Sequence, residues 1–265
     1  MKQTLFVLLA LLLALGLAAC GAPAATATPS PEASESTNAL TPEPTSETTP
    51  EPVVVFTDDA LEAKVREAMG RPEGDIIVAE AQAVVKLDLS NESFDDMNRQ
   101  NGGIRDISDL KYFTGLEELN LSYNDISDFT PIAELTSIKV LGFNGIRPKD
   151  LSVLKGLTNM TCLIFDWTCD ESQWRNGNVS LDFMADMKDL EIFSAIGGGI
   201  KDINALGGLT KIWSLYLENN AITDISSLAN LTNLKELKLS NNPIGDYSPL
   251  KDIYPKLDFS DFEMK

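Results

Sequence analysis

The feature that most constrains the fold of this 265-residue chain is a repeat of 22 residues. One unit reads Leu116-x-x-Leu119-x-Leu121-x-x-Asn124-x-Ile126-x-Asp128. Ile138 begins the next unit, seven units follow one another from residue 84, and Leu257-x-Phe259 closes the series. Each unit exposes an apolar edge that only its neighbour can bury, so the units must stack into a solenoid.

The Leu-x-Leu segment of each unit predicts a short strand whose leucines point inward and whose flanking residues point outward. Asn124, Asn220 and Asn242 follow these strands, where an inward amide can bond the backbone of adjacent coils. The middle units hold other residues at this position, namely Ile146, Thr168 and Gly198. We therefore expect the asparagine ladder to be interrupted in the central units.

An aspartate recurs where each unit turns back: Asp106, Asp128, Asp150, Asp202, Asp224 and Asp246. We predict that each carboxylate caps the free amide hydrogens of its own turn. A calcium ladder is the alternative, but one carboxylate per unit lacks the alternating carboxylates of a calcium loop. No metal site and no cofactor are predicted.

These repeats resemble the leucine-rich repeat family, specifically the 22-residue bacterial class of internalin-like surface proteins. The resemblance covers residues 84–259. It implies an α/β solenoid with a parallel β-sheet on the concave face, short 3₁₀ turns on the convex face and an N-terminal helical cap. It also implies a binding module rather than an enzyme.

Residues 53–83 have the pattern of that cap. Leu61 and Val65 lie on one face of a predicted helix, which Asp58 can cap at its start and Gly70 can end. One short amphipathic helix has no core of its own, so it must cover the open end of the first coil.

Residues 1–19 have the pattern of a secretory signal, with Lys2 before an unbroken apolar run. The run ends in Leu17-Ala18-Ala19-Cys20, which resembles the bacterial lipobox. That resemblance predicts lipidation of Cys20 and an anchor on the extracellular face of the bacterial cell membrane. An ordinary signal with a chance cysteine is the alternative.

Residues 20–52 are rich in Pro, Thr, Ser and Glu and contain no Lys, Arg or aromatic residue. Such a segment cannot bury enough apolar surface to offset the entropy of ordering. It predicts a disordered tether that holds the repeat domain, residues 84–265, away from the membrane.

The composition excludes several functions. The chain has no His, so no His-dependent triad and no His-ligated metal site can form. Lys and Arg number 21 against 40 Asp and Glu, a net charge of −19, which argues against nucleic acid as a partner. No catalytic residue is predicted.

The outward strand positions predict the binding surface. Their apolar members gather in the central units, where we expect one patch formed by Val140, Ile164, Trp167, Ile192, Ile196 and Tyr216. Ile164 and Ile192 are expected to be exposed. A one-residue slip of the third unit is the alternative, and it would turn Trp167 inward.

Polar insertions interrupt the repeat near 92–103 and 168–178, and the second contains Trp174, which we add to the candidate ligand-binding residues. Cys162 and Cys169 flank the start of that insertion. In a regular coil they lie too far apart for a disulfide, whereas an irregular unit could bring them together, so both arrangements stay open.

We predict a cell-surface lipoprotein whose concave face binds a protein ligand. The alternatives are a structural stalk or envelope component, or a glycan-binding module. A stalk needs only a uniformly polar concave face, which the apolar members of the central units disfavour.

Overall fold

The computed structural model describes residues 51–91, 103–167 and 179–264. Predictions for the signal peptide, Cys20, nearly all of the tether, the two insertions, Trp174 and Cys169 lie outside these residues.

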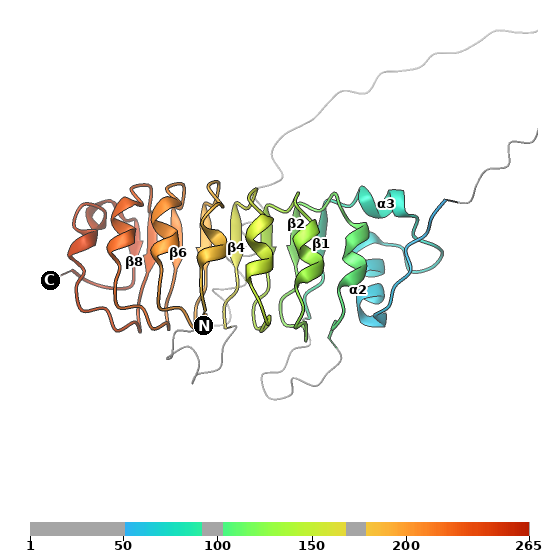
Figure 1. Cartoon of the computed structure of the whole chain (residues 1–265), viewed down its shortest axis with the longest axis horizontal. Coiled ribbons are helices and arrows are strands. Elements are labelled where there is room, and N and C mark those ends of the chain that lie inside the picture. Colours follow the sequence, from blue (N-terminus) through green and yellow to red (C-terminus); the bar gives the residue numbers. More distant parts are fainter. Residues whose placement is uncertain (1–50, 92–102, 168–178, 265) are drawn as a thin grey trace, which may run out of the picture. The chain divides into compact units, whose positions relative to one another are not determined.

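The described residues of the repeat domain form an eight-stranded parallel sheet whose strands follow one another in sequence order (Figure 1). The strands are β1 Lys86–Asp88, β2 Glu118–Asn120, β3 Val140–Gly142, β4 Cys162–Ile164, β5 Ile192–Ser194, β6 Ser214–Tyr216, β7 Glu236–Lys238 and β8 Phe259–Ser260. We number each coil after its strand. The middle residue of each strand from β1 to β7 is buried, as the Leu-x-Leu pattern predicts.

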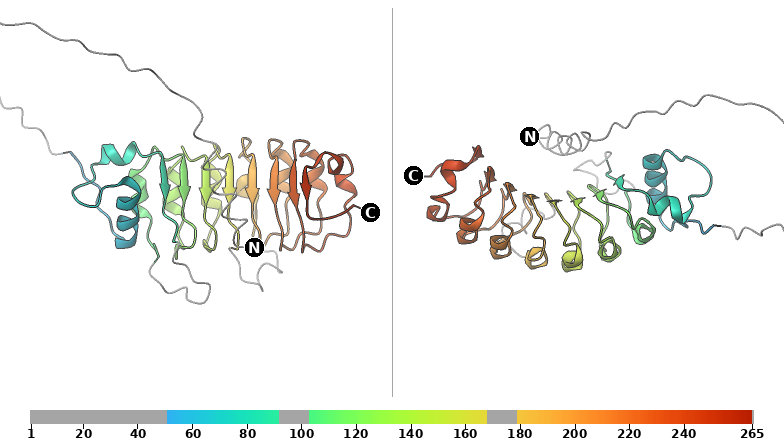
Figure 2. Two further views of the ribbon diagram at one scale, coloured as in Figure 1. Left: turned by 180° about the vertical axis from the view of Figure 1, so that it is seen from behind. Right: turned by 90° about the horizontal axis from the view of Figure 1, so that it is seen from above.

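Short 3₁₀ turns close the coils on the side opposite the sheet. Seen along the strands, the sheet lines the inner side of the curved stack and the turns lie on its outer side (Figure 2). The turns are η1 Ser108–Tyr112, η2 Thr130–Glu134, η3 Ser152–Gly156, η4 Asp182–Met184, η5 Asn204–Gly208, η6 Ser226–Asn230, η7 Ser248–Leu250 and η8 Tyr254–Lys256. The predicted solenoid is therefore confirmed, with its parallel sheet on the concave face.

The helical cap is also present. Helix α2 (Asp59–Met69) begins at Asp58, whose Oδ1 accepts the amide hydrogens of Ala60 and Leu61 at 2.9 Å each. It ends at Gly70, which has a left-handed φ of 64°. A second helix, α3 (Val78–Gln82), leads into β1.

Asp58 also attaches the cap to the first coil. Its second oxygen, Oδ2, accepts the amide hydrogens of Arg105 and Asp106 at 2.9 Å each. Thr57 adds a hydroxyl bond of 2.9 Å to the buried carboxylate of Asp109. One aspartate thus caps its own helix and joins that helix to the solenoid.

The asparagine ladder forms as predicted. Asn220 donates to the carbonyls of Ala195 and Leu217, and its Oδ1 accepts from the amide of Ile200 at 2.9 Å. Asn124 and Asn242 make the same kind of contacts in coils 2 and 7. In coil 3, Ile146 is instead buried at the corresponding position.

The recurrent aspartates are turn caps, as predicted. In each case Oδ1 accepts, at 2.8 Å, the amide hydrogen two residues further on; the six are Asp106, Asp128, Asp150, Asp202, Asp224 and Asp246. Coil 4 has no such aspartate, and Ser180 caps its turn instead by accepting from the amide of Asp182 at 3.1 Å.

The closing strand differs from the prediction. Phe259 pairs with the outward Glu236 and is 50% exposed, so Leu257 and Phe259 are not the inward pair of a last unit. Phe262 packs on the core instead, with its ring 5.0 Å from that of Tyr247. After β8 the described chain therefore packs an aromatic ring on the core, rather than the inward pair of a Leu-x-Leu strand.

Candidate functional site

The predicted binding residues lie on the concave face in the predicted register. Ile164 of β4 pairs with Gly142 of β3 and Ser194 of β5, and Cys162 pairs with Val140 and Ile192. The strand has not slipped, so the alternative in which Trp167 turns inward is wrong. Trp167 is 41% exposed.

The expected exposure of Ile164 and Ile192 is wrong. Ile164 is 5% exposed and Ile192 6%, and Tyr216 is also buried. Side chains on one face of a sheet stand about 5 Å from those of the next strand, and concave curvature brings them closer still. These residues form a packed floor, and Trp167 is an exposed aromatic group at its edge, just beyond the end of β4.

Trp167 has a left-handed backbone conformation, and its ring packs on the glycine of the next coil. Its φ is 58°, and each of coils 2 to 7 has a residue with positive φ just beyond its strand: Tyr123, Gly145, Trp167, Gly197, Asn219 and Asn241. A Cβ added to Gly197 would lie 2.7 Å from Trp167 Cε3, so the indole ring lies directly against that glycine. Tyr123 covers Gly145 in the same way, with a corresponding distance of 2.9 Å.

A second ladder of hydrogen bonds runs along the outward side of the central coils. Ser122 Oγ accepts from the amide of Asn144 at 3.0 Å, and Asn144 Oδ1 accepts from the amide of Asp166 at 2.8 Å. Asp166 Oδ1 then accepts from the amide of Ile196 at 2.8 Å and from the hydroxyl of Ser194 at 2.6 Å. All three ladder residues are buried.

Among the described residues of this face, two carboxylates have an oxygen with no hydrogen-bond partner. These are Oδ2 of Asp166, which is wholly buried, and Oε2 of Glu218 in coil 6. Burial raises the pKa of Asp166 to about 6 and that of Glu218 to about 7, and the negative charges of Asp261 and Asp166 add to the rise for Glu218. Lys238 opposes both shifts, with its Nζ 3.8 Å from Glu218 Oε1.

Charged and aromatic groups form the C-terminal side of the same face. The Tyr216 hydroxyl donates to Glu236 Oε2, and Ser214 Oγ is 3.1 Å from that oxygen. The ammonium of Lys238 lies 4.5 Å from the centre of the Tyr216 ring and 5.3 Å from that of Phe259. Burial raises the pKa of Tyr216 to about 12, so its phenol stays protonated and can donate.

Cys162 carries a free thiol and is buried between the floor residues of β3 and β5. Burial raises its pKa to about 12, which keeps it in the unreactive thiol form. The structure therefore gives Cys162 no disulfide, and its proposed partner Cys169 is not among the described residues.

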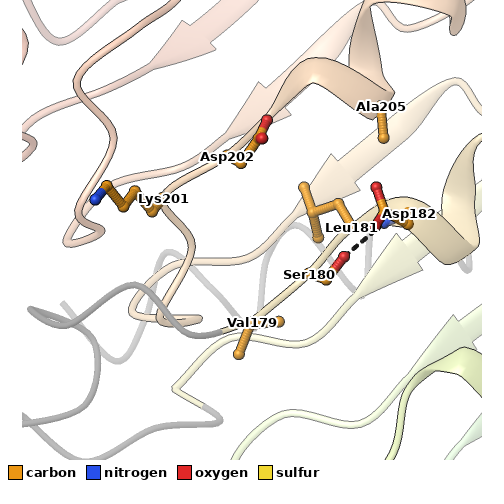
Figure 3. Close-up of a pocket in the computed structure, with 7 residues that line it drawn as sticks. All are labelled: Val179, Ser180, Leu181, Asp182, Lys201, Asp202 and Ala205. Carbon is orange, nitrogen blue, oxygen red and sulfur yellow. Dashed lines mark hydrogen bonds between the residues drawn. The ribbon is translucent and has the colours of Figure 1, made fainter.

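A pocket of about 280 Å³ lies on coils 4 and 5, away from the strands (Figure 3). Its lining comes from the segments that lead into η4 and η5: Val179, Ser180, Leu181, Asp182, Lys201, Asp202 and Ala205. Ser180 and Asp202 already serve there as turn caps. The pocket is a gap between two turns and brings together no catalytic set.

The residues placed by the structure contain no group of three or more Asp, Glu or Cys side chains arranged to hold a metal ion. Nor does any helix within the described ranges have the length and apolar character needed to span a membrane.

Comparison with known proteins agrees with this architecture. Residues 214–252 match the family described as Leucine Rich repeats (2 copies), and residues 115–128 match the family described as Leucine Rich repeat. No curated protein matches the chain in sequence.

Two solved structures from Listeria monocytogenes are similar over 80% of this chain, each at 26% identity: internalin F, with a TM-score of 0.60, and internalin C2, with a TM-score of 0.59. The chain spans 65% of the internalin F chain and 97% of the internalin C2 chain. The fold and these matches define a leucine-rich repeat protein. Within that class, the chain is internalin-like.

Sequence reasoning did not identify the outward ladder or the free oxygens of Asp166 and Glu218. Asp166 stands at an outward position two residues beyond β4, where a solvated carboxylate is expected. The available signal was the run of Ser122, Asn144 and Asp166 at one outward position of successive coils, since short polar side chains in such a run can bond the backbone of the next coil.

Proposed function

We propose that this protein is a non-enzymatic binding module whose concave face receives a protein ligand. The observation that carries the proposal is the exposed Trp167 ring at the edge of a packed apolar floor. Exposed aromatic side chains held by rigid surroundings are typical anchors of protein interfaces. Similarity to the internalin fold supports a role in protein interaction.

The floor and its surroundings have the arrangement expected of an interface. Val140, Ile196 and Trp167 keep accessible apolar surface around the buried floor. Glu118 and Lys238 supply charged groups on either side along the sheet. Accessible apolar groups with charged neighbours are expected of an interface.

A pair of tryptophan variants tests the interface. The full chain is immobilised and used to capture proteins from the medium and surface extracts of its natural surroundings, and bound species are identified by mass spectrometry. Trp167→Ala should lose a ligand that the wild-type chain retains. Trp213→Ala is the matched control, because Trp213 is 36% exposed but precedes β6, at the other end of the strands.

If both tryptophan variants capture the same proteins as the wild type, the proposal that the concave face binds the ligand is wrong. Loss in both variants would indicate a general effect on the fold, which circular dichroism would detect. Trp174 of the second insertion is a further proposed contact, and Trp174→Ala extends the same series.

We further propose that Cys20 is lipidated and that residues 20–52 tether the repeat domain to the outer face of the cell membrane. The lipobox-like Leu17-Ala18-Ala19-Cys20 motif supports this proposal. Metabolic labelling with a radioactive fatty acid should mark the wild-type chain and not Cys20→Ala. Cys162→Ala is the control, and it should remain labelled because its thiol is buried.

A further inference from the structure

A row of residues borders the concave face three positions beyond each strand from β1 to β7, and we call it the edge row. Its members are Asn91, Tyr123, Gly145, Trp167, Gly197, Asn219 and Asn241. The backbone amide of each of the first six donates to a carbonyl of the next coil, at 2.6 to 3.0 Å. The hydrogen-bonded ladder of the sheet therefore continues through the edge row, which keeps the sheet's spacing between coils.

Two aromatic rings stand in the edge row, two coils apart. The Tyr123 ring lies against Gly145 and the Trp167 ring lies against Gly197, so each ring leans toward the coil that follows it. Trp167 is exposed and Tyr123 is half-buried, so both reach the surface. Because both rings lean the same way, their separation is two strand spacings, about 9.5 Å.

This separation identifies the ligand backbone that can contact both rings. A polyproline II helix has three residues per turn and rises about 3.1 Å per residue, so residues i and i+3 lie about 9.3 Å apart on one side. An extended strand repeats on one side every two residues, at about 6.7 Å, and an α-helix places residues i and i+7 about 10.5 Å apart. The polyproline II helix matches the two rings most closely.

The charges of the chain favour an uncharged segment at this place. All seven members of the edge row are uncharged, although the chain has 21 Lys and Arg and 40 Asp and Glu. Asp125, two residues beyond Tyr123, is already paired with Arg105 at 3.1 Å. A charged side chain docked on the row would lose hydration without gaining a partner. Proline is uncharged, and a proline-rich segment is already in the polyproline II conformation, so it loses little entropy on docking.

We propose that Tyr123 and Trp167 bind a proline-rich segment of the protein ligand, with prolines three residues apart packed on the two rings. This inference rests on the proposed function, since the segment belongs to the protein that the concave face receives. The polyproline II helix runs along the edge row, across the strands. Asn219 lies two coils beyond Trp167, where the next turn of the helix arrives. Its side-chain amide can donate to a peptide carbonyl, which this helix leaves unpaired.

The test uses oligoprolines of three and six residues, blocked at both ends, as probes. Three prolines reach one ring, whereas six include the pair i and i+3 that reaches both. Nuclear magnetic resonance titration of the full chain should show saturable shifts of the Gly145 and Gly197 amides with hexaproline. Hexaproline should bind at least about tenfold more tightly than triproline, because two contacts act together. A blocked hexapeptide of Gly and Ser should give no saturable shift.

Tyr123→Asn and Trp167→Asn each remove one ring and keep a residue that suits the backbone, since Asn219 and Asn241 have φ of 57° and 58° in the same row. Each variant should raise the Kd for hexaproline about tenfold and reduce its advantage over triproline to about twofold, because one ring remains. Trp213→Ala is the control and should leave both affinities unchanged, since Trp213 is exposed at the other end of the strands.

Equal affinity of the wild type for triproline and hexaproline, or an unchanged ratio in both asparagine variants, would overturn the proposal. Circular dichroism shows whether each variant is folded, and if one of them is not, the other decides. A hexamer of N-acetylglucosamine is titrated in parallel, because aromatic rings also bind sugars. Saturable shifts with this hexamer and none with hexaproline would assign the edge row to a glycan and contradict the proposal.

The two proposals can fail separately. If Trp167→Ala loses the captured protein while hexaproline does not bind the wild type, the concave interface stands and the proline site is wrong. If hexaproline binds with the expected variant profile while Trp167→Ala retains the captured protein, the proline site stands and that protein binds elsewhere.

Discussion

The central coils 3 to 5 and the flanking coils 2, 6 and 7 share one register but hold their backbones together differently. In the flanking coils an inward asparagine bonds to both its own and the preceding coil, as Asn220 does. In the central coils phenylalanine rings fill the interior, and the polar bridging moves to the outward side, as in Asn144 and Asp166.

The two arrangements compete for the same interior space. Phe143 stacks on Phe165 at 5.2 Å, and Phe165 contacts Phe193 at 5.5 Å. A Cβ on Gly198, at the asparagine position of coil 5, would lie 3.3 Å from the Phe165 ring. An asparagine there would therefore clash with the Phe165 ring. A coil can contain either the stacked phenylalanine or the inward asparagine, but not both.

The difference also falls on the face that we propose as functional. The flanking coils bury their asparagine bridges inside. The central coils have their polar bridge on the concave face, where among the described residues the buried Asp166 of coil 4 keeps one oxygen, Oδ2, without a hydrogen-bond partner. Departure from the repeat pattern therefore coincides with the exposed Trp167 ring, which we propose as the anchor of the interface.

Removing the central ring should have the largest effect. Phe165→Ala leaves a cavity between two rings and should lower the free energy of unfolding by about 3–5 kcal/mol. Urea unfolding followed by circular dichroism measures the change. Phe165→Leu is the control and should lose much less; a loss below about 1 kcal/mol for the alanine variant would mean that the stacked rings are not the core of these coils.

Removing the flanking amide should come next. Asn220→Ala leaves the Ile200 amide and the Ala195 and Leu217 carbonyls without their side-chain partner, which should cost about 3 kcal/mol. Asn233→Ala is the control, because Asn233 is exposed and makes one bond, to the Thr210 carbonyl. If the two variants have the same free energy of unfolding, the inward asparagine stabilises the fold no more than an exposed asparagine does.

The sequence was sufficient to predict the features that repeat. The inward leucines, the turn-capping aspartates and the asparagine ladder follow from local chemistry that recurs every coil, and the structure confirms each of them. The helical cap followed from Asp58 and Gly70, whose roles are equally local.

The features that the sequence could not predict depend on contacts with the side chains of neighbouring coils. Ile164 and Ile192 are outward in register but buried, because their exposure depends on side chains from adjacent strands. The free oxygen of Asp166 depends on Ser194, which is 28 residues away. Phe259 was misplaced because it pairs with the outward Glu236, a register that the pattern Leu257-x-Phe259 does not reveal by itself.

Acidity should affect the buried carboxylates and the turn-capping aspartates in opposite directions. Asp166 has a folded pKa of about 6, above its ordinary value of 3.8, so its charge destabilises the fold at neutral pH and this penalty is lost as the pH falls through 6 toward 4. The penalty is at most about 3 kcal/mol. Hydrogen bonds from Ser226 and Ser248 instead lower the pKa of the caps Asp224 and Asp246, whose stabilisation is lost as the pH falls below the ordinary value.

Thermal unfolding between pH about 7.5 and about 3 should therefore show a maximum of stability near pH 4 to 5. In the double variant Asp166→Asn, Glu218→Gln, stability should increase much less as the pH falls from about 7.5 to about 5. The loss of stability below about pH 4 should remain. Asp224→Asn should change the acid limb alone. A double variant with the same profile as the wild type would show that neither buried carboxylate titrates in this range.

The smallest effect should come from the glycine beneath the tryptophan. Gly197→Ala places a methyl group 2.7 Å from Trp167 Cε3 and a side chain at a φ of 63°, so both the ring and the backbone resist it. We expect a loss of about 1–2 kcal/mol together with a shift of tryptophan fluorescence as the ring moves. Gly145→Ala is the matched control, since its φ is 71° and its ring neighbour is Tyr123. It should show a similar loss of stability without the Trp167 signal, and a fluorescence change of equal size in both variants would mean that Gly197 does not position the Trp167 ring.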